Sequence, residues 1–456
     1  MKVLYSFGTD GIREKYPFLN DVIAYILGKS FAKIVNNNNK VVIGYDTRFN
    51  SYSIALSLAS SLISEGFKVE ISSTYVSTPT LAFITKHKKC YGFQITASHN
   101  PFYYNGIKIL YKGLKIEDNL EKKIETTLNT SLNRIHDDFS NYLELFKTQF
   151  KSYGNLKFSN FISVYSNKII NYIRSYVDTL KSWEIIIDLS NGALSNYAGN
   201  IYKNLGAKVN IINNKPDGFN INHECGATNI NLFKEKFLTL SKNYNKSIGF
   251  SFDGDGDRVI CIYKSNKETI ILDGDLILLI ISKFLKNVLK YNIQSVAITQ
   301  MSSLGIEKAF KKENIKVIRT EVGDKYITRA ILEGKADLGA EQSGHIVIPP
   351  FLYTGDGILS SLFLLASINF IDPFKVVQEI EKYEQKLINI PVINKKEFIN
   401  KNQKLFDKIS KNYKDVRLYV RPSGTEDIVR ILIESKEIQL IKEIESIINK
   451  EVVINV

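Results

Sequence analysis

The chain has 456 residues, of which 44% are hydrophobic and 23% are charged, as in an ordinary folded protein. At about 150 residues per domain, this length predicts roughly three domains with substantial cores and excludes a disordered chain or a stapled mini-protein. The 60 Lys and Arg residues against 47 Asp and Glu residues give a formal net charge of +13. Such an excess suits nucleic acid, anionic membranes or phosphorylated small molecules, but the chain is rich in Lys, Asn and Ile throughout, which favours a general lysine background.

Cysteine usage and hydropathy indicate a cytoplasmic protein. The three cysteines form no C-x-x-C pair, which argues against a disulfide framework and against a zinc site. The first residues contain no apolar stretch of the kind found in signal peptides. The longest uncharged segment, residues 357–371, is shorter than the about 20 residues that span a bilayer. We therefore expect no membrane partner.

Three segments of the chain repeat one order of strand, helix, glycine and strand. The expected elements are 41–46, a helix to 65 and 68–71; then 184–188, a helix to 205 and 208–211; then 295–299, 304–313 and 315–318. Short apolar runs that alternate with helical stretches and glycine stops predict βαβ units with parallel or mixed sheets.

Gly28-Lys29-Ser30 resembles the end of a P-loop, but Ile23 stands where that motif requires glycine, so Lys29 is expected on a solvated helix face.

The last part of the chain follows a different pattern. After the proline-containing pairs at 372–373 and 390–391, the sequence predicts a helix at 401–412, strands at 416–420 and 428–433, and a final helix. The expected fold class is therefore α/β, with three related mixed-sheet domains and a smaller α+β domain. The expected domains are 1–150, 151–250, 251–370 and 371–456.

A run of alternating aspartates is the strongest chemical signal in the sequence. Asp253, Asp255 and Asp257 follow the apolar run 248–252, are separated by glycines and precede Arg258. Carboxylates at alternate positions can converge on one side of a loop, and glycine permits such a tight turn. Oxygen ligands indicate Mg²⁺ or a similar hard cation, whereas the alternative is a solvated acidic turn. An EF-hand is excluded because Arg and Lys occupy its required Gly and Glu positions.

A second motif, Thr96-Ala97-Ser98-His99-Asn100-Pro101, follows a predicted strand. A serine in this place is a candidate nucleophile or phosphate carrier, although the sequence is not that of a nucleophile elbow. The alternative is a serine turn before proline. Neighbouring Ser98 and His99 side chains are expected to point apart, and Lys108 downstream could meet an anion on the serine.

Three further loops contain candidate binding residues. Residues 421–426 combine a guanidinium with two hydroxyls and a glycine, which suits a phosphate nest, while a plain hairpin turn is the alternative. Arg430 on the next predicted strand could reach the same anion. The loop 339–345 places polar side chains between glycines, which suits sugar hydroxyls or an amine. A glycine-rich loop at 7–13 ends in Arg13.

Together these motifs resemble those of the α-D-phosphohexomutase superfamily over essentially the whole chain. FGTDGIR, TASHNP with NG-x-K, DGDGDR, GAEQSGH and RPSGTE occur in this order. FGTDGIR, the tetrapeptide CGAT and AEQSGH make the chain most similar to the bacterial phosphoglucosamine mutase subgroup. The resemblance implies four domains around a central cleft.

The resemblance also implies roles for individual residues. Ser98 corresponds to the phosphoserine, and the three aspartates correspond to a loop that holds one Mg²⁺ per subunit together with a phosphate oxygen on that serine. The remaining residues are expected near the transferred group (Lys108, His99 and Arg258), near the sugar (Arg13, Glu341, Ser343 and His345) and around the second phosphate (Arg421, Ser423, Gly424, Thr425 and Arg430). Lys108 is the first candidate for the general base and His99 the second.

The implied activity is the interconversion of glucosamine 6-phosphate and glucosamine 1-phosphate in UDP-N-acetylglucosamine biosynthesis. Glucosamine 1,6-bisphosphate is the expected intermediate and activator, and the subunit is expected to act as a monomer or homodimer. Phosphomannomutase/phosphoglucomutase activity is the alternative within the same superfamily. A phosphatase with Asp253 as nucleophile leaves Ser98, Glu341 and Arg421 unexplained, and a nucleic-acid partner is not expected because no basic run lies on one face.

Overall fold

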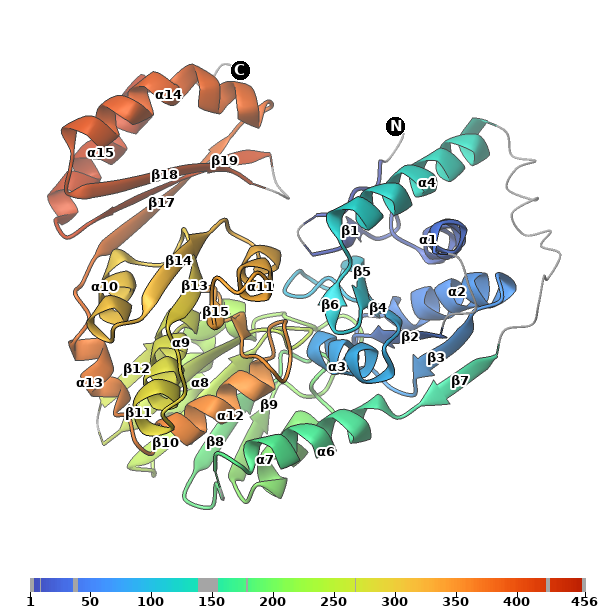
Figure 1. The fold of residues 1–456 in the computed structure, drawn as a ribbon, viewed down its shortest axis with the longest axis horizontal. Coiled ribbons are helices and arrows are strands. Elements are labelled where there is room, and N and C mark those ends of the chain that lie inside the picture. Colours follow the sequence, from blue (N-terminus) through green and yellow to red (C-terminus); the bar gives the residue numbers. More distant parts are fainter. Residues whose placement is uncertain are drawn as a thin grey trace.

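The computed structural model describes residues 4–8, 10–35, 40–137, 155–177, 179–266, 268–423 and 427–452. These residues form four sheets that follow one another along the chain, the first three of which are covered by helices in α/β units. The fourth sheet is small and lies beside the third unit (Figure 1). Three α/β units and a smaller C-terminal unit confirm the expected fold class.

The first sheet has the strand order β1-β5-β4-β2-β3-β7, with β6 paired to β5. Strands β2, β3, β4 and β7 are parallel to one another, β5 is antiparallel to β4, and β1 is antiparallel to β5. The strands are β1 (Ile12–Lys15), β2 (Lys40–Tyr45), β3 (Lys68–Ser72), β4 (Tyr91–Ile95), β5 (Tyr104–Tyr111), β6 (Leu114–Lys115) and β7 (Leu156–Ser159). The helices are α1 (Asp21–Ile34), α2 (Ser51–Ser64), α3 (Thr78–Lys88) and α4 (Asp118–Asp137).

The second sheet has the order β12-β11-β10-β8-β9. Its strands are β8 (Glu184–Asp188), β9 (Lys208–Ile212), β10 (Lys246–Phe252), β11 (Val259–Ser265) and β12 (Glu268–Leu272), and its helices are α6 (Phe161–Ile173), α7 (Ala198–Asn204), η1 (Ala227–Asn229) and α8 (Ile230–Leu240). The expected boundary at residue 250 falls within β10, and β11 and β12 complete the same sheet. We therefore propose that the second domain extends through β12. Because β7 pairs with β3 in the first sheet, we likewise propose that the first domain reaches past residue 150.

The third sheet has the order β14-β13-β15-β16 and the fourth β17-β19-β18. The third unit contains β13 (Ser295–Thr299), β14 (Lys316–Thr320), β15 (Leu338–Ala340), β16 (Ile346–Val347), α9 (Gly274–Lys283), η2 (Phe284–Val288), α10 (Leu304–Lys312), α11 (Asp324–Leu332), α12 (Gly357–Ser367) and α13 (Pro373–Gln378). The fourth contains β17 (Glu384–Pro391), α14 (Lys395–Asn412), β18 (Val416–Pro422), β19 (Ile428–Ser435) and α15 (Ile438–Glu451). Helix α14 begins before the expected residue 401 because Asn394 caps it by accepting a hydrogen bond from the Glu397 N–H.

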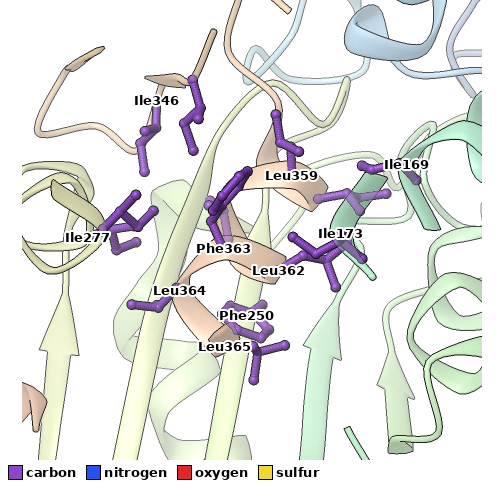
Figure 2. Close-up of a cluster of buried hydrophobic side chains, with 14 of the residues drawn as sticks. Ile169, Ile173, Phe250, Ile277, Ile346, Leu359, Leu362, Phe363, Leu364 and Leu365 are labelled. Carbon is purple, nitrogen blue, oxygen red and sulfur yellow. The ribbon is translucent and has the colours of Figure 1, made fainter. Parts of the chain in front are cut away.

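Helix α12 is the centre of the main core. Every residue of this helix is buried, as expected for a helix that is apolar on all sides. In Figure 2 its side chains Leu362 and Phe363 lie among Ile173 of α6, Phe250 of β10 and Ile277 of α9. This cluster is continuous through the first three units, whereas the fourth unit buries a separate core between its sheet and α14 and α15. The fourth unit can therefore move as a body without opening the main core.

Lys29 is buried rather than solvated, so the expectation for this side chain was wrong. Helix α1 packs along α2, where Gly28 lies directly against Ser61. The Lys29 Nζ atom is 2.8 Å from Oε1 of Glu65, and the ammonium also lies over the Tyr25 ring.

Within the described part of the chain, no helix is long and apolar enough to cross a bilayer.

Candidate active site

Ser98 lies in the turn that follows strand β4. Its φ of 51° is in the left-handed region, and its N–H donates to Oγ1 of Thr96. The buried hydroxyl donates to Oδ2 of Asp253 over 2.9 Å. Nδ1 of His99 is 3.4 Å from the same Oγ, so the expectation that these neighbours point apart was wrong. The left-handed turn brings both side chains to one side of the chain.

The three aspartates converge in the turn between β10 and β11. One oxygen from each of Asp253, Asp255 and Asp257 lies within 4.8 Å of the others, and all three residues are buried. Burial and the neighbouring Asp257 and Asp255 raise the pKa of Asp253 well above its usual range. Within the described structure, Oδ1 of Asp255 and Oδ1 of Asp257 have no hydrogen-bond partner. Such buried oxygens fit a hard divalent cation such as Mg²⁺.

Lys108 on β5 reaches the same carboxylates. Its Nζ is 2.7 Å from Oδ2 of Asp255, 2.8 Å from Oδ2 of Asp10 and 3.6 Å from Oδ2 of Asp257. Burial disfavours the charge, but Asp10, Asp255 and Asp257 together raise the pKa of Lys108 above its ordinary value. Because a raised pKa makes this ammonium a weak acid and keeps it charged, the geometry favours a cationic role for Lys108 over the basic role expected from the sequence.

Asp10 is a functional candidate that the sequence reasoning missed. It pairs with Lys108, Lys115 and Arg13, and Lys115 pairs in turn with Asp324 of the third unit. Burial opposes ionisation, but Lys108, Lys115 and Arg13 hold the pKa of Asp10 well below its ordinary value. The only sequence signal was its position in the glycine-rich loop before Arg13. Asp10 thus links the N-terminal loop to the Lys108 cluster.

His99 and Arg258 form the boundary between the Ser98 turn and the cavity described below. Burial, together with the cations Arg258 and Arg13, lowers the pKa of His99 to about 3, so its imidazole is neutral. Arg258 donates its backbone N–H to Asp253 Oδ1 at 3.2 Å, and its Nε is 3.8 Å from Asp257 Oδ1. A neutral imidazole therefore lies next to Ser98, and the Arg258 guanidinium lies beside Asp257 of the triad.

The loop between β15 and β16 contains the expected sugar-binding residues. Glu341 Oε1 accepts from the Gly323 N–H at 2.9 Å, and Oε2 accepts from Ser343 Oγ at 3.1 Å. His345 is buried, with Nε2 accepting from the Gly355 N–H at 2.9 Å and Nδ1 3.6 Å from Asp257. His345 therefore supports the aspartate loop as well as lining the cavity. Sugar contacts by these residues stay predictions.

The strands β18 and β19 place two arginines side by side. Arg421 and Arg430 are opposite each other in the antiparallel pair. Burial and the nearby Arg430 lower the pKa of Arg421, and Nε of Arg421 is buried without a hydrogen-bond partner among the described residues. Adjacent guanidiniums are the arrangement that a phosphate dianion stabilises. Ser423 is buried at the strand end, whereas Gly424 and Thr425 lie outside the described residues.

Many of these groups line one cavity of about 810 Å³, which is large enough for a sugar phosphate. Its described lining does not include Ser98, Lys108, Asp253, Asp255 or Ser343. Its lining comes from all four units and includes Arg13, His99, Asp257, Arg258, Glu341, His345, Arg421, Ser423 and Arg430. The sequence reasoning missed the lining segment 321–326, which precedes and opens helix α11. Glu321 in this segment accepts a hydrogen bond from the Tyr419 hydroxyl at 2.8 Å, so the segment also contacts the fourth unit.

Four domains of the phosphoglucomutase/phosphomannomutase family match this chain in order. They are α/β/α domain I at 5–134, α/β/α domain II at 163–266, α/β/α domain III at 273–383 and the C-terminal domain at 387–451. A phosphoglucosamine mutase of Thermotoga neapolitana is 36% identical over 448 residues, which cover 97% of this chain and 98% of the relative. Another, from Caldicellulosiruptor bescii, is 34% identical and covers 96% of each chain.

Solved structures share the fold. A phosphoglucomutase/phosphomannomutase family protein from Burkholderia thailandensis has a TM-score of 0.76 at 19% identity, covering 96% of this chain and 95% of that one. N-acetylphosphoglucosamine mutase of Aspergillus fumigatus, in complex with GlcNAc-6P and magnesium, has a TM-score of 0.70 at 16% identity and covers 98% and 95%.

The fold and these relatives thus define an isomerase of the mutase type, in which all four units contribute to the lining of one cavity. The chain belongs to the phosphoglucomutase/phosphomannomutase family, the α-D-phosphohexomutase superfamily, and its curated relatives described above are phosphoglucosamine mutases.

Proposed function

We propose that the protein interconverts glucosamine 6-phosphate and glucosamine 1-phosphate in the cytoplasm, in UDP-N-acetylglucosamine biosynthesis. The observation that carries the proposal is the Ser98 hydroxyl, buried 2.9 Å from an aspartate triad. This triad adjoins a cavity whose fourth-unit wall presents two arginines. A phosphoryl carrier and a separate phosphate site beside one cavity suit a substrate that carries phosphate at two positions in turn. All these residues belong to one chain, so a monomer and a homodimer both fit.

In the proposed reaction, phosphorylated Ser98 donates its phosphoryl group to O1 of glucosamine 6-phosphate. The P–Oγ bond breaks and Oγ takes up a proton, while a P–O1 bond forms and the O1 hydroxyl releases its proton to a nearby base. The 1,6-bisphosphate then reverses its orientation. Its 6-phosphoryl group returns to Ser98 Oγ, which gives up its proton, while O6 takes one up to leave glucosamine 1-phosphate. Nδ1 of His99, 3.4 Å from Oγ, is placed to exchange a proton with Ser98, but burial and the neighbouring cations that lower its pKa make it a weak base.

Charge on the migrating phosphoryl group must be offset for transfer to occur, because a phosphoserine carries about −1.5 to −2 at neutral pH. Lys108 contacts Asp255 and the Arg258 guanidinium lies beside Asp257, so both provide positive charge at the aspartate loop that binds the Ser98 hydroxyl. A bound Mg²⁺, held by Asp253, Asp255 and Asp257, would neutralise further charge on the phosphoryl oxygens.

Arg421 and Arg430 bind the phosphate that does not react. The same pair must receive the 6-phosphate in one half-reaction and the 1-phosphate in the other. The fourth unit has a core of its own, which allows it to adjust to both orientations as a body.

A coupled mutase assay on the purified protein, with glucosamine, glucose and mannose phosphates compared, tests the substrate. We expect glucosamine phosphate to be preferred. A more than tenfold preference for glucose or mannose phosphate would instead establish the phosphomannomutase/phosphoglucomutase alternative. Peptide mass spectrometry tests the phosphoryl carrier. We expect phosphate on Ser98 of the wild type, and we expect Ser98→Ala to carry no phosphate and to show no turnover. Phosphate found on Asp253 refutes the mechanism.

A further inference from the structure

Two side chains from different units hold the backbone of the Ser98 turn. Nη2 of Arg48 donates to the carbonyl oxygens of Ser98 and Asn100 at 3.0 and 2.9 Å. Nδ2 of Asn222 donates to the same two oxygens at 2.8 and 3.1 Å. Arg48 follows strand β2 of the first sheet, whereas Asn222 lies in the loop between β9 and η1 of the second. Four hydrogen bonds therefore converge on two carbonyl groups beside the proposed phosphoryl carrier.

The Arg48 side chain donates hydrogen bonds to this turn and to the neighbouring residues Asp46 and Tyr104. Its Nε donates to Oδ2 of Asp46 at 2.9 Å, and its Nη1 donates to the carbonyl oxygens of Tyr104, at 2.9 Å, and Pro101. The side chains of Arg48 and Asp46 are both fully buried. Asp46 also accepts from Oγ1 of Thr96, which in turn accepts the Ser98 N–H. A buried ion pair is costly to desolvate, so its complete set of hydrogen bonds indicates a requirement for one fixed geometry.

Asn222 connects the same turn to the aspartate loop. A Cβ atom placed on Gly254 would lie 2.7 Å from Nδ2 of Asn222 and 2.7 Å from the carbonyl oxygen of Ser98. The Asn222 amide, the Ser98 carbonyl and the backbone of the loop between Asp253 and Asp255 are thus in close contact. Holding the carbonyl of Ser98 fixes the backbone from which its Oγ donates to Asp253.

We propose that Arg48 and Asn222 are positioning residues that hold Ser98 Oγ against the aspartate loop during phosphoryl transfer. The inference rests on the proposed role of Ser98 as phosphoryl carrier. The Arg48 side chain is fully buried and the Asn222 amide donates to the carbonyl oxygens of the turn, so we expect neither to bind the sugar phosphate. Their loss is therefore expected to reduce kcat while leaving KM for the sugar phosphate unchanged, since a 1 Å misplacement of a reacting group costs about 100-fold in rate.

Asn222→Asp is the sharpest variant because it keeps the shape of the side chain and removes both donors. We expect its kcat, and the single-turnover rate of transfer from phosphorylated enzyme to sugar phosphate, to fall by about 10- to 100-fold. Asn220→Ala is the matched control. Asn220 lies in the same loop with similar exposure, accepts from the Asp217 N–H and donates to the Lys215 carbonyl. The control removes two hydrogen bonds from the loop without touching the Ser98 turn, so its kcat should equal that of the wild type.

Arg48→Lys supplies an independent test because one ammonium cannot reproduce the fork of the guanidinium. If Arg48→Lys folds, it should show the same fall in kcat at unchanged KM. If Arg48→Lys does not fold, the test of the inference is Asn222→Asp alone. Equal kcat in Asn222→Asp and wild type, or an equal fall in Asn222→Asp and Asn220→Ala, overturns the inference while leaving the proposed function intact. Wild-type protein that turns over without phosphate on Ser98 overturns both.

Discussion

The substitution Arg421→Met should affect substrate binding and the free energy of unfolding in different ways, because Arg421 lies at the proposed site of the second phosphate. In the free protein Arg421 faces Arg430 across two strands, and burial and Arg430 lower its pKa. Like charges at such a cross-strand position are destabilising, within a range of about 0.2–1 kcal/mol for these pairs. Removing one of them is therefore expected to leave the free energy of unfolding unchanged or to raise it by up to about 1 kcal/mol.

The same substitution should weaken substrate binding. A hydrogen bond to a charged group contributes about 1.5–3 kcal/mol, which corresponds to a rise in KM of about 10- to 150-fold. Because the non-reacting phosphate is held in both ground and transition states, the loss should appear mainly in KM and less in kcat. Steady-state kinetics with glucosamine 6-phosphate and urea unfolding of the free protein measure the two effects.

Arg417→Met is the matched control on the same strand and the same face. Arg417 Nε donates to Oε2 of the fully buried Glu434 at 2.7 Å, and its Nη atoms donate to the carbonyl oxygens of Gln300 and Ser302. Breaking this pair leaves a buried carboxylate and should cost about 3–5 kcal/mol of stability. The reasoning is refuted if Arg421→Met loses stability as Arg417→Met does while its KM stays that of the wild type.

Two further substitutions test the charges inside the molecule. Asp253→Asn removes one of three repelling carboxylates, so the thermal midpoint of the protein in EDTA should rise. The variant should lose its activity and the stabilisation that added Mg²⁺ gives to the wild type. If Mg²⁺ raises the midpoint of the variant as much as that of the wild type, the metal binds elsewhere. Burial raises the pKa of Asp356 from 3.8 to about 6, against hydrogen bonds from the Leu359 N–H and the Tyr165 hydroxyl. The corresponding stabilisation, roughly 3 kcal/mol, is complete below pH 4 and lost as the pH rises through 6. As the pH rises from 4 to 7, the free energy of unfolding of the wild type should therefore fall relative to that of Asp356→Asn, as measured by urea titrations. If the difference between the two proteins does not vary with pH, the raised pKa of Asp356 is contradicted.

The elements that could be predicted from the sequence are those determined by local patterns. Strands β8 and β13 have the expected bounds, and β2, α2 and β3 differ from expectation by a residue or so at their ends. The aspartate triad was also predictable, because alternating Asp and Gly after a buried strand leave few other geometries. Ser98 and the triad lie 155 residues apart in sequence, and their contact followed from the family resemblance rather than from the local pattern.

What could not be predicted depends on contacts between distant segments. Lys29 looks like a solvated lysine until α2 places Glu65 beside it. The state of Lys108 is likewise set by Asp10, Asp255 and Asp257, which no local window contains. The segment 321–326 carries no chemical motif, and only its position between the third and fourth units brings it to the cavity.

The formal charge of +13 illustrates the same limit, because a sum over the chain says nothing about which charges face each other. The cavity contains Arg13, Arg258, Arg421 and Arg430, but Asp10, Asp257, Asp324 and Glu341 lie in its walls as well. Around Lys108 the charges are already matched by carboxylates, whereas Arg421 and Arg430 face each other. Adjacent guanidiniums suit a phosphate dianion, so we expect phosphate binding by the fourth unit and reaction at Ser98 to use different parts of the molecule.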